Sequence, residues 1–465
     1  MIFFKGPVRR LATFAAAALA ALCAAPAQAQ LTDRATLAPA IDAYLAPLLE
    51  TNNFSGVILV AKGDRIVAEK GFGYANVEHK VPNGPGTLFQ VASVSKPFTA
   101  AAILLLAERG KIDLHAPLAR ILPDYPNGER LTIHHLLTHG SGIANINAFP
   151  DFAEIQRRPQ RPADLVELFK AKALEFAPGE RYSYSNSNYN LLALIVEKAS
   201  GLPFDAFLQR EILAPLKLGR TGHRGPMSRI VPDLADGYAP EGALGLERAA
   251  YLDWSSKTGN GSLYSDARGI LGFVRAANRG GLLKPTSAAA AFTQHFPNIG
   301  YGWFLTEAHG RRLHHINGRS PGFTAQVDHF VEEDVTVIVL SNLYISVTTP
   351  IARAVSALWF GKPVEPLPPL TAQKLTRERI RGLLGTYQFG ADYYVPNSKV
   401  RIVERDGGIA GEYVGTDYPP FAFTATSDGR FLIRSFWMPA EFEAGTDGRA
   451  AALKLGPFSG DRVSE

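Results

Sequence analysis

The sequence predicts a protein of the mixed α/β (α+β) class: an antiparallel sheet flanked by helices, with a helical insertion, followed by a small antiparallel β domain. Three observations predict this class. Strand-like runs stand at both ends of the segment 40–360, and helical patterns with Pro- and Gly-rich turns fill residues 115–290 between them. Short alternating strands separated by Asp-Gly dipeptides then fill residues 374–465, as is typical of hairpins.

The first 29 residues have the organisation of a secretory signal peptide. Three basic residues precede an apolar run at 11–25, and a small-residue site, A-Q-A, ends at Ala29. A membrane anchor is the weaker alternative because the apolar run is short and rich in alanine. A lipoprotein would need a small residue before Cys23, where the chain has Leu22. We therefore expect cleavage after Ala29 and a secreted, periplasmic protein.

The composition excludes several classes of function. The 48 basic residues of the chain fall to 45 once the three in residues 1–29 are removed, against 43 acidic residues, which leaves +2. Because Lys and Arg form no cluster, we expect no nucleic-acid partner, and because no second long apolar run exists, no membrane span. The only cysteine, Cys23, leaves with residues 1–29, which excludes a thiol nucleophile, a disulfide and a thiolate metal site.

The main domain is expected over residues 30–361. Its elements are predicted in order as a helix at 39–50, a hairpin over 54–73, a buried apolar helix at 93–109, strands within 311–323 and 334–342, and a helix at 349–360. Strands from the two ends of the domain are expected to pair in one sheet, with the helical insertion between them along the chain.

A linker and a second domain are expected after the main domain. Residues 362–373 contain four prolines, which favour a stiff exposed connection. Asp406-Gly407, Asp428-Gly429 and Asp447-Gly448 then separate short alternating strands such as KVRIVE and AAALKL. Because an Asp-Gly pair between such strands favours a hairpin turn, residues 374–465 are predicted to form the small β domain.

Ser93 and Lys96 form an S-x-x-K pair at the start of the predicted helix 93–109. Residues three apart lie on one helix face, so the Ser93 hydroxyl and the Lys96 amine can hydrogen-bond. Pro97 lacks an N–H, which is harmless only if the helix begins near Ser93. A serine at that positive helix end, beside a buried lysine of lowered pKa, is a candidate nucleophile with its base. The alternative is a serine N-cap with a solvated lysine.

Two further segments supply candidate partners for Ser93. Tyr184 and Asn186, in YSYSNSNYN, offer a phenol that can carry a proton and an amide that can hold substrate and lysine, although such residues also form plain turns. Gly318, in HHINGRSPGF, would let a substrate approach the strand backbone. An N–H just after Gly318 would pair with that of Ser93 as an oxyanion hole. The alternative for this third segment is a glycine-rich strand end.

In this order, the three segments resemble the serine β-lactamase and penicillin-binding superfamily. The resemblance is closest to its branch of class C β-lactamases, D-alanyl-D-alanine carboxypeptidases and esterases. Supporting segments similar to that branch are GFGYANVEHK, LTIHHLLTHGSGI, GNGSLYSDARGI and VTVIVLSN. The resemblance covers roughly residues 40–360 and implies a β-lactamase/transpeptidase-like fold for them.

The resemblance also implies roles for individual residues. Ser93 would be the acylated nucleophile, Lys96 the general base or its electrostatic partner, and Tyr184 the proton shuttle. Asn186 would orient the substrate, and the backbone N–H groups of Ser93 and Arg319 would bind the oxyanion. No metal or cofactor is expected.

The third segment departs from the family pattern. Where the family has Lys or His, then a small or polar residue, then Gly, this chain has Ile316, Asn317 and Gly318. A cation at the first position meets the carboxylate of a β-lactam or a D-Ala terminus, which Ile316 cannot do. His315 would substitute if the strand carried a bulge, and Arg319 would substitute from the other side. An esterase is therefore favoured over a carboxypeptidase or a β-lactamase.

Two literal motif matches are interpreted as structural. Lys257 begins a K-T-G sequence, but in a turn before a helix and not on a strand. Ser320 is the centre of a G-x-S-x-G sequence, but Pro321 has no N–H for an oxyanion hole, and strands follow where a helix should. The histidines have no metal-binding spacing, so polar or packing roles are expected for them.

We expect a secreted serine hydrolase that cleaves a small-molecule ester, amide or peptide through an acyl-enzyme on Ser93. The first alternative is a D-alanyl-D-alanine carboxypeptidase or β-lactamase, which the signal peptide favours and Ile316 disfavours. The second is a non-catalytic binding protein of the same fold, which the intact Lys96 and Tyr184 disfavour. The sequence leaves the oligomeric state and the role of residues 374–465 open.

Overall fold

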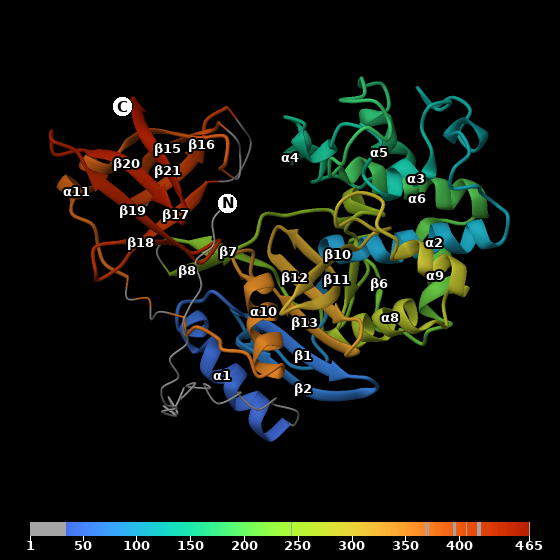
Figure 1. Ribbon diagram of the computed structural model, residues 1–465, viewed down its shortest axis with the longest axis horizontal. Helices are drawn as coiled ribbons and strands as arrows, with labels where there is room; N and C mark the ends of the chain where they lie inside the picture. The colour runs from blue at the N-terminus through green and yellow to red at the C-terminus, as the bar shows by residue number, and fades with distance from the viewer. Residues whose placement is uncertain are drawn as a thin grey trace, which may run out of the picture.

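The computed structural model describes residues 34–242, 244–367, 370, 372–393, 397–405, 407–415 and 420–464 (Figure 1). The predicted signal peptide, with Cys23, lies outside these residues. Within them the chain forms a main domain built on one large sheet, followed by a closed barrel. No helix among the described residues is long and apolar enough to cross a membrane.

The sheet of the main domain has six antiparallel strands in the order β10-β11-β12-β13-β1-β2. The strands are β1 (Gly56–Lys62), β2 (Arg65–Phe72), β10 (Phe304–Ala308), β11 (Arg311–Ser320), β12 (Phe323–Phe330) and β13 (Val335–Ser341). β1 pairs with β13, so the two ends of the domain meet inside the sheet. The prediction of one sheet built from both ends of the segment is confirmed.

Helices cover both faces of this sheet and create two cores. On one face lie α1 (Arg34–Glu50) and α10 (Thr348–Trp359), and on the other α2 (Lys96–Glu108) and α8 (Ala267–Arg279). Neighbouring strand residues face opposite sides, so Val57 and Leu59 of β1 pack into the α2 core while Ile58 and Val60 pack into the α1 core. A strand buried on both faces is apolar throughout, which explains the continuous run GVILVA in β1.

The helical insertion surrounds α2. Its helices are α3 (Ile133–Leu137), α4 (Phe152–Ile155), α5 (Pro162–Phe169), α6 (Asn186–Ser200), α7 (Phe204–Leu208) and α9 (Pro285–Ala291), with a π-helical turn at Gln209–Leu213 and 3₁₀ turns at Leu118–Arg120, Ile146–Ala148 and Trp254–Lys257. A further 3₁₀ turn, Ala92–Ser95, precedes α2. Small sheets pair β3 (Tyr74–Asn76) with β4 (Val81–Pro82), β7 (Tyr238–Glu241) with β8 (Gly245–Arg248), and β9 (Leu263–Ser265) with β5 (Phe89–Gln90) and β6 (Gly222–His223). α2 is buried from Lys96 to Leu106, as its apolar sequence predicts.

The C-terminal residues form a closed barrel of eight strands, at the upper left of Figure 1. The helix α11 (Arg377–Leu383) precedes β14 (Gly385–Phe389), β15 (Lys399–Arg405), β16 (Gly408–Tyr413), β17 (Phe421–Ala425), β18 (Phe431–Ile433), β19 (Met438–Ala444), β20 (Ala450–Leu455) and β21 (Phe458–Ser464). Asp428-Gly429 connects β17 to β18, and Asp447-Gly448 connects β19 to β20, as the turn pattern predicts. The third predicted turn includes Asp406, which lies outside the described residues. β21 closes the barrel on β14. The small antiparallel β domain is confirmed, and its closure is a feature that the sequence did not predict.

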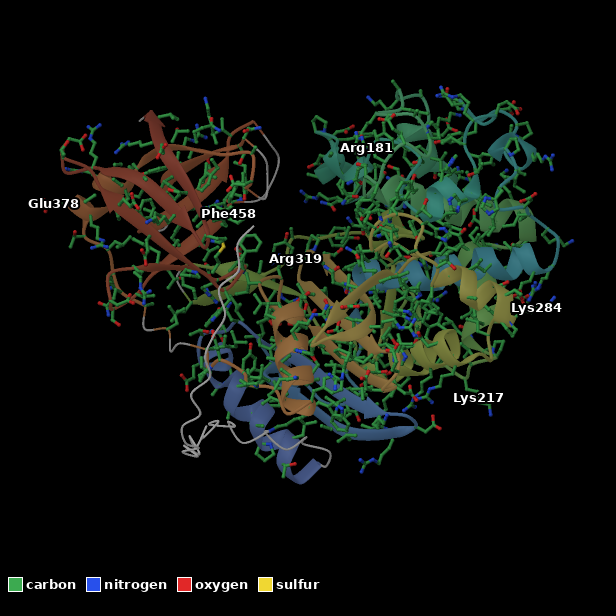
Figure 2. The ribbon with its side chains drawn as sticks, viewed as in Figure 1. Arg181, Lys217, Lys284, Arg319, Glu378 and Phe458 are labelled. Carbon is green, nitrogen blue, oxygen red and sulfur yellow. The ribbon has the colours of Figure 1, made fainter. Side chains whose placement is uncertain are left out.

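Arg434 joins the barrel to the main domain. It lies between β18 and β19 and is 2% exposed. Its guanidinium donates to the Thr51 carbonyl at 2.8 Å and to Asn53 Oδ1 at 2.8 Å, and Asn53 donates to the Arg434 carbonyl at 3.0 Å. Arg319 in β11 donates to the carbonyl of the next barrel residue, Ser435, at 3.3 Å (Figure 2). The barrel therefore docks beside the end of β11.

Candidate active site

Ser93 lies in the 3₁₀ turn Ala92–Ser95, directly before α2. The sequence predicted an α-helix from Ser93, whereas the α-helix begins at Lys96, with Pro97 in its first turn. The difference has a local cause: Ala92 has a left-handed backbone, with φ of 47°, which turns the chain sharply after β5. Ser93 still stands at the N-terminal end of α2, one tight turn outside the α-helix.

Four predicted site residues meet around the Ser93 hydroxyl. Ser93 Oγ lies 2.9 Å from Tyr184 OH and 3.0 Å from Lys96 Nζ. Lys96 Nζ also donates to Asn186 Oδ1 at 2.9 Å and to the backbone carbonyl of Asn260 at 2.9 Å. The amine is therefore held by three oxygens, one of which, the Asn260 carbonyl, the sequence analysis missed. A backbone acceptor leaves no side-chain pattern by which it could have been found.

Asn186 is positioned by the start of α6. It is the first residue of that helix, where backbone N–H groups have no partner within the helix. Its N–H donates to Asn145 Oδ1 at 3.0 Å, and its side-chain amide donates to Asn147 Oδ1 at 3.0 Å. With the amide nitrogen held in this way, Asn186 Oδ1 is left to face Lys96. Asn145 and Asn147 are further site residues that the sequence analysis did not identify.

The electrostatics of Lys96 suit a base. Lys96 is 1% exposed, and no carboxylate of the described residues pairs with it. Burial, followed by the nearby charge of Lys257, lowers the pKa of Lys96 well below its usual value. Burial raises the pKa of the Tyr184 phenol, so that group keeps its proton at neutral pH. An amine that is neutral and a phenol that is protonated can together accept and donate a proton at Ser93 Oγ.

His139 lies behind Tyr184, with the two rings 4.5 Å apart. Its Nδ1 accepts the Ser185 N–H at 3.2 Å, so the neutral ring carries its proton on Nε2. Burial, and then the charge of Lys96, lowers the pKa of His139 to about 3. His139 therefore stays neutral near the site and packs against the phenol, in line with the expectation of a packing role for the histidines.

Gly318 brings β11 against the Ser93 turn. A Cβ on Gly318 would lie 2.3 Å from the Val91 carbonyl oxygen and 3.1 Å from the Ser93 nitrogen. Only glycine allows this approach without moving the backbone. The strand backbone around Gly318 thus lies next to the Ser93 N–H, which is the arrangement that an oxyanion hole between Ser93 and Arg319 requires.

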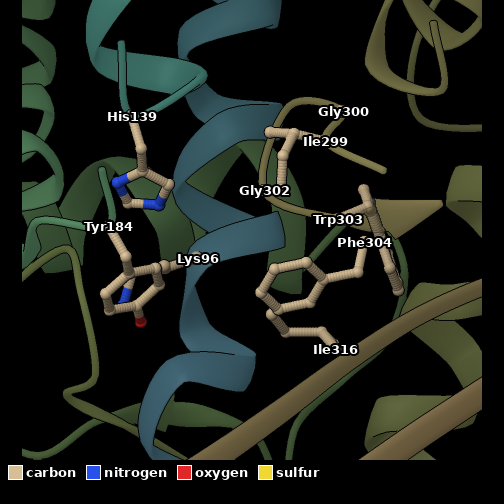
Figure 3. Close-up of a pocket in the computed structure, with 9 residues that line it drawn as sticks. All are labelled: Lys96, His139, Tyr184, Ile299, Gly300, Gly302, Trp303, Phe304 and Ile316. Atoms are coloured by element: carbon tan, nitrogen blue, oxygen red, sulfur yellow. The ribbon is translucent and has the colours of Figure 1, made fainter. Parts of the chain in front are cut away.

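Ile316, two residues before Gly318, lines a small pocket beside Lys96 and Tyr184 (Figure 3). It is 3% exposed. Trp303 and Phe304 lie beside Ile316 in this pocket wall, and His139 lines it on the side of Tyr184. The position where the family carries a cation is therefore occupied by an aliphatic side chain beside two aromatic ones.

The structure does not let His315 or Arg319 replace that cation. β11 pairs with β12 in continuous register without a bulge, so His315, Asn317 and Arg319 face the opposite side from Ile316. The His315 ring stacks on Phe304 at 5.3 Å, and burial lowers its pKa to about 4. The Arg319 guanidinium binds the Tyr344 carbonyl at 2.8 Å. Both expected substitutions are therefore corrected: neither side chain is aimed at the pocket.

The two literal motif matches lie where the sequence analysis expected. Lys257 ends the 3₁₀ turn Trp254–Lys257 and does not lie on a strand. Ser320 ends β11 and is followed by a turn and β12, not by a helix. No group of three metal-ligating side chains that could hold an ion occurs among the described residues.

The fold and this cluster define a serine hydrolase of the superfamily that contains β-lactamases and penicillin-binding proteins. Residues 41–356 match the family model described as Beta-lactamase, so the chain belongs to the β-lactamase family. It is 28% identical over 440 residues to penicillin-binding protein 4* of Bacillus subtilis, which covers 87% of this chain and 94% of that protein.

Two solved structures show the same fold at low sequence identity. The octameric penicillin-binding protein homologue from Pyrococcus abyssi aligns with a TM-score of 0.63 at 24% identity, covering 91% of this chain and 99% of that one. The D-amino acid amidase from Ochrobactrum anthropi SV3 aligns with a TM-score of 0.63 at 22% identity, covering 69% of this chain and 98% of that one. At these identities the likeness concerns the fold alone.

Proposed function

We propose that this serine hydrolase is an esterase that acts through an acyl-enzyme on Ser93. One observation carries the proposal: Ser93 Oγ lies within hydrogen-bonding distance of both Lys96 Nζ, at 3.0 Å, and Tyr184 OH, at 2.9 Å. A serine hydroxyl becomes a nucleophile when a base takes its proton and a second group supplies one to the leaving group. The lowered pKa of Lys96 and the raised pKa of Tyr184 favour the protonation states that these two roles need.

In the proposed reaction, Ser93 Oγ bonds to the substrate carbonyl carbon while its proton passes to Lys96. The carbonyl oxygen takes up the electron pair and is stabilised by the N–H groups of Ser93 and Arg319. The bond to the leaving oxygen then breaks, and the proton returns from Lys96 through Tyr184 to that oxygen. Water repeats the sequence on the acyl-enzyme, releases the acid and restores Ser93. Asn186 keeps Lys96 aimed at the serine throughout.

Ile316 supports an ester over a substrate with a terminal carboxylate at this position. A carboxylate placed against Ile316, Trp303 and Phe304 would lose its hydration without gaining a cation from any of these three side chains, which costs free energy. An uncharged, apolar leaving group that packs against the Ile316 side chain would instead bury apolar surface.

The test is labelling of the purified full chain with a fluorophosphonate and turnover of p-nitrophenyl butyrate. We expect the mass increase on the peptide that contains Ser93, and Ser93→Ala should lose both label and turnover. Ser320→Ala is the matched control and should keep both. A label on Ser320, or full turnover by Ser93→Ala, would overturn the proposal.

A second candidate is an amidase or carboxypeptidase that acts on D-amino acid substrates. It is favoured by the names of the relatives, a penicillin-binding protein and a D-amino acid amidase. Penicillin should then acylate Ser93 in the wild-type chain at a rate comparable with the ester. If the esterase proposal is right, wild-type acylation by penicillin is slow and Ile316→Lys accelerates it, because the variant supplies the missing cation.

We also propose that the chain is exported to the periplasm with cleavage after Ala29. The support is the signal-peptide organisation of residues 1–29. N-terminal sequencing of the protein from a periplasmic extract should begin at Gln30. Recovery of the full-length chain from the cytoplasm alone would contradict this proposal.

A further inference from the structure

Lys257 is a second buried lysine near Ser93 that the proposed reaction does not use. It is 5% exposed, and its ammonium lies 4.7 Å from the centre of the Phe152 ring. Among the described residues, no carboxylate forms an ion pair with it. Burial lowers the pKa of Lys257 to about 8, so the group is still mostly protonated at neutral pH. Lys257 is therefore a buried cation whose ammonium faces an aromatic ring and is paired with no carboxylate of the residues that the structure describes.

Lys257 begins the segment 257–261, which also contains the Asn260 carbonyl that accepts a hydrogen bond from Lys96. The Lys257 carbonyl accepts the N–H groups of Asn260, at 3.0 Å, and of Gly261, at 2.8 Å. The Asn260 carbonyl in turn accepts the bond from Lys96 Nζ at 2.9 Å. A Cβ on Gly261 would lie 3.5 Å from both Lys257 Cβ and the carbonyl carbon of Ala92. The stem of Lys257 and the turn that carries Ser93 thus pack on the same glycine.

The like charges of Lys96 and Lys257 also repel each other. The charge of Lys257 contributes to the lowered pKa of Lys96, which happens only when two like charges are close in a poorly solvated region. Burying a charged amine without an anion is unfavourable, and a leucine or methionine would fill the same space without that cost. A second free polar group lies on the same segment, because the buried Asn260 Nδ2 has no protein hydrogen-bond partner. Together these groups point to an anionic ligand.

We propose that Lys257 binds a carboxylate on the acyl part of the substrate, so that the enzyme prefers half-esters of dicarboxylic acids to esters of simple fatty acids. This inference rests on the proposed function of Ser93. The acyl part is assigned because the leaving group must depart beside Tyr184, the proton donor, where the apolar pocket of Ile316 lies. Lys257 does not line that pocket, so the acyl chain is the part of the substrate that we assign to it.

With Lys257 as the binding group, the enzyme can bind a substrate carboxylate although Ile316 stands where the family has a cation. In the proposed enzyme the carboxylate of the substrate is bound on the side of Ser93 that faces Lys257. The two sides of Ser93 therefore prefer different parts of the substrate, one uncharged and one negatively charged. The apolar side binds the leaving group, and the Lys257 side binds the acid. A charge-assisted hydrogen bond to a buried ammonium is strong enough to decide between two otherwise equal substrates.

The test compares two p-nitrophenyl esters that share a leaving group: the glutaric acid half-ester, which carries a carboxylate, and the pentanoate ester, which does not. The quantity measured is the ratio of kcat/KM for the charged ester to that for the neutral one. We expect a ratio above one in the wild-type chain and a fall of roughly 10- to 100-fold in Lys257→Met. Lys257→Arg should keep most of the ratio, and Lys284→Met, which removes an exposed lysine, should leave it unchanged.

The ratio removes any general effect of Lys257 on Lys96, because that effect acts on both esters equally. A wild-type ratio below one, or an equal ratio in wild type and Lys257→Met, would overturn the inference. If Lys257→Met does not fold, the wild-type ratio and competitive inhibition by free glutarate, against free pentanoate, still decide the question. Failure of the inference alone leaves Ser93 acylated by the pentanoate ester, whereas failure of the proposed function leaves Ser93 unmodified by either ester.

Discussion

The carbonyl oxygen of Val91 lies only 2.3 Å from the point where a Cβ on Gly318 would stand. β11 can therefore approach the Ser93 turn because Gly318 has no side chain. We predict that Gly318→Ala lowers kcat/KM at least tenfold, because the strand must move away from the Ser93 N–H. The expected loss of stability is modest, about 1–3 kcal/mol, as for other overpacked sites.

Steady-state ester hydrolysis and urea denaturation of Gly318→Ala check this prediction. Gly219→Ala is the matched control, because a Cβ on Gly219 has no neighbour within 4 Å. Equal activity of the two variants would mean that the approach of β11 to Ser93 has no role in the reaction.

Gly318 illustrates what the sequence could predict. The sequence pattern predicts its spacing from Ile316 and its place on a strand. The same kind of pattern predicts the hairpins, the buried helix α2 and the pairing of Ser93 with Lys96. In a strand without a bulge, alternation places His315 on the opposite side from Ile316. Only the observed register between β11 and β12 excludes a bulge. The contact between the Asn260 carbonyl and Lys96 could not be predicted from the sequence, because it depends on how distant segments of the chain pack together.

Tyr184 OH lies 2.9 Å from Ser93 Oγ, and we predict that its importance depends on the leaving group. An alkoxide leaving group needs a proton, so Tyr184→Phe should lower kcat/KM for an ethyl ester by about 10²- to 10⁴-fold. A p-nitrophenolate leaving group is stable without a proton and should show a much smaller loss. The comparison of ethyl and p-nitrophenyl butyrate in the variant measures the difference.

Tyr182→Phe is the control for Tyr184, because the phenol that bonds Ser93 Oγ is that of Tyr184, whereas the Tyr182 ring packs 5.9 Å from that of His139. Its activity should be near wild type on both esters. If Tyr184→Phe lost the same factor on both esters, the phenol would position Ser93 and would not deliver the proton.

His134 makes the main domain sensitive to acid. Its ring lies 4.9 Å from that of His115 and 4.8 Å from that of His295, and its Nδ1 is 2.8 Å from Tyr301 OH. Burial, and then the charges of His295, His115 and His135, lower the pKa of His134 to about 4. Because this pKa lies below the value of about 6.5 in an unfolded chain, the folded state binds fewer protons. The stabilisation is complete above pH 6.5 and is lost as the pH falls towards 4.

Urea denaturation at pH 7.5 and pH 5.0 measures this effect. The midpoint of the wild-type chain should fall at the lower pH, and His134→Gln should fall less, because glutamine takes up no proton. His79→Gln removes an exposed histidine and should behave like wild type. Equal falls in wild type and His134→Gln would assign the acid sensitivity to other groups.

Arg434 and Asn53 hold the barrel on the main domain, and we predict that this contact is required for stability. Arg434→Met would leave Asn53 Oδ1 and the Thr51 carbonyl without the donors that lie 2.8 Å away, inside a buried interface. Unpaired buried acceptors cost free energy, so unfolding should become easier by roughly 2–3 kcal/mol. Arg401→Met breaks only an exposed pair with Glu412 and should cost about 0–1 kcal/mol.

Limited proteolysis of the two variants gives the second readout for Arg434. If the barrel is released from the main domain, cleavage in the segment 362–373 should be faster in Arg434→Met than in Arg401→Met. Ester turnover should also fall, because Arg319 in β11 loses its bond to Ser435 when the barrel moves away, and the predicted oxyanion-hole N–H belongs to Arg319. Unchanged stability and cleavage in Arg434→Met would mean that the barrel is held by its apolar contacts alone.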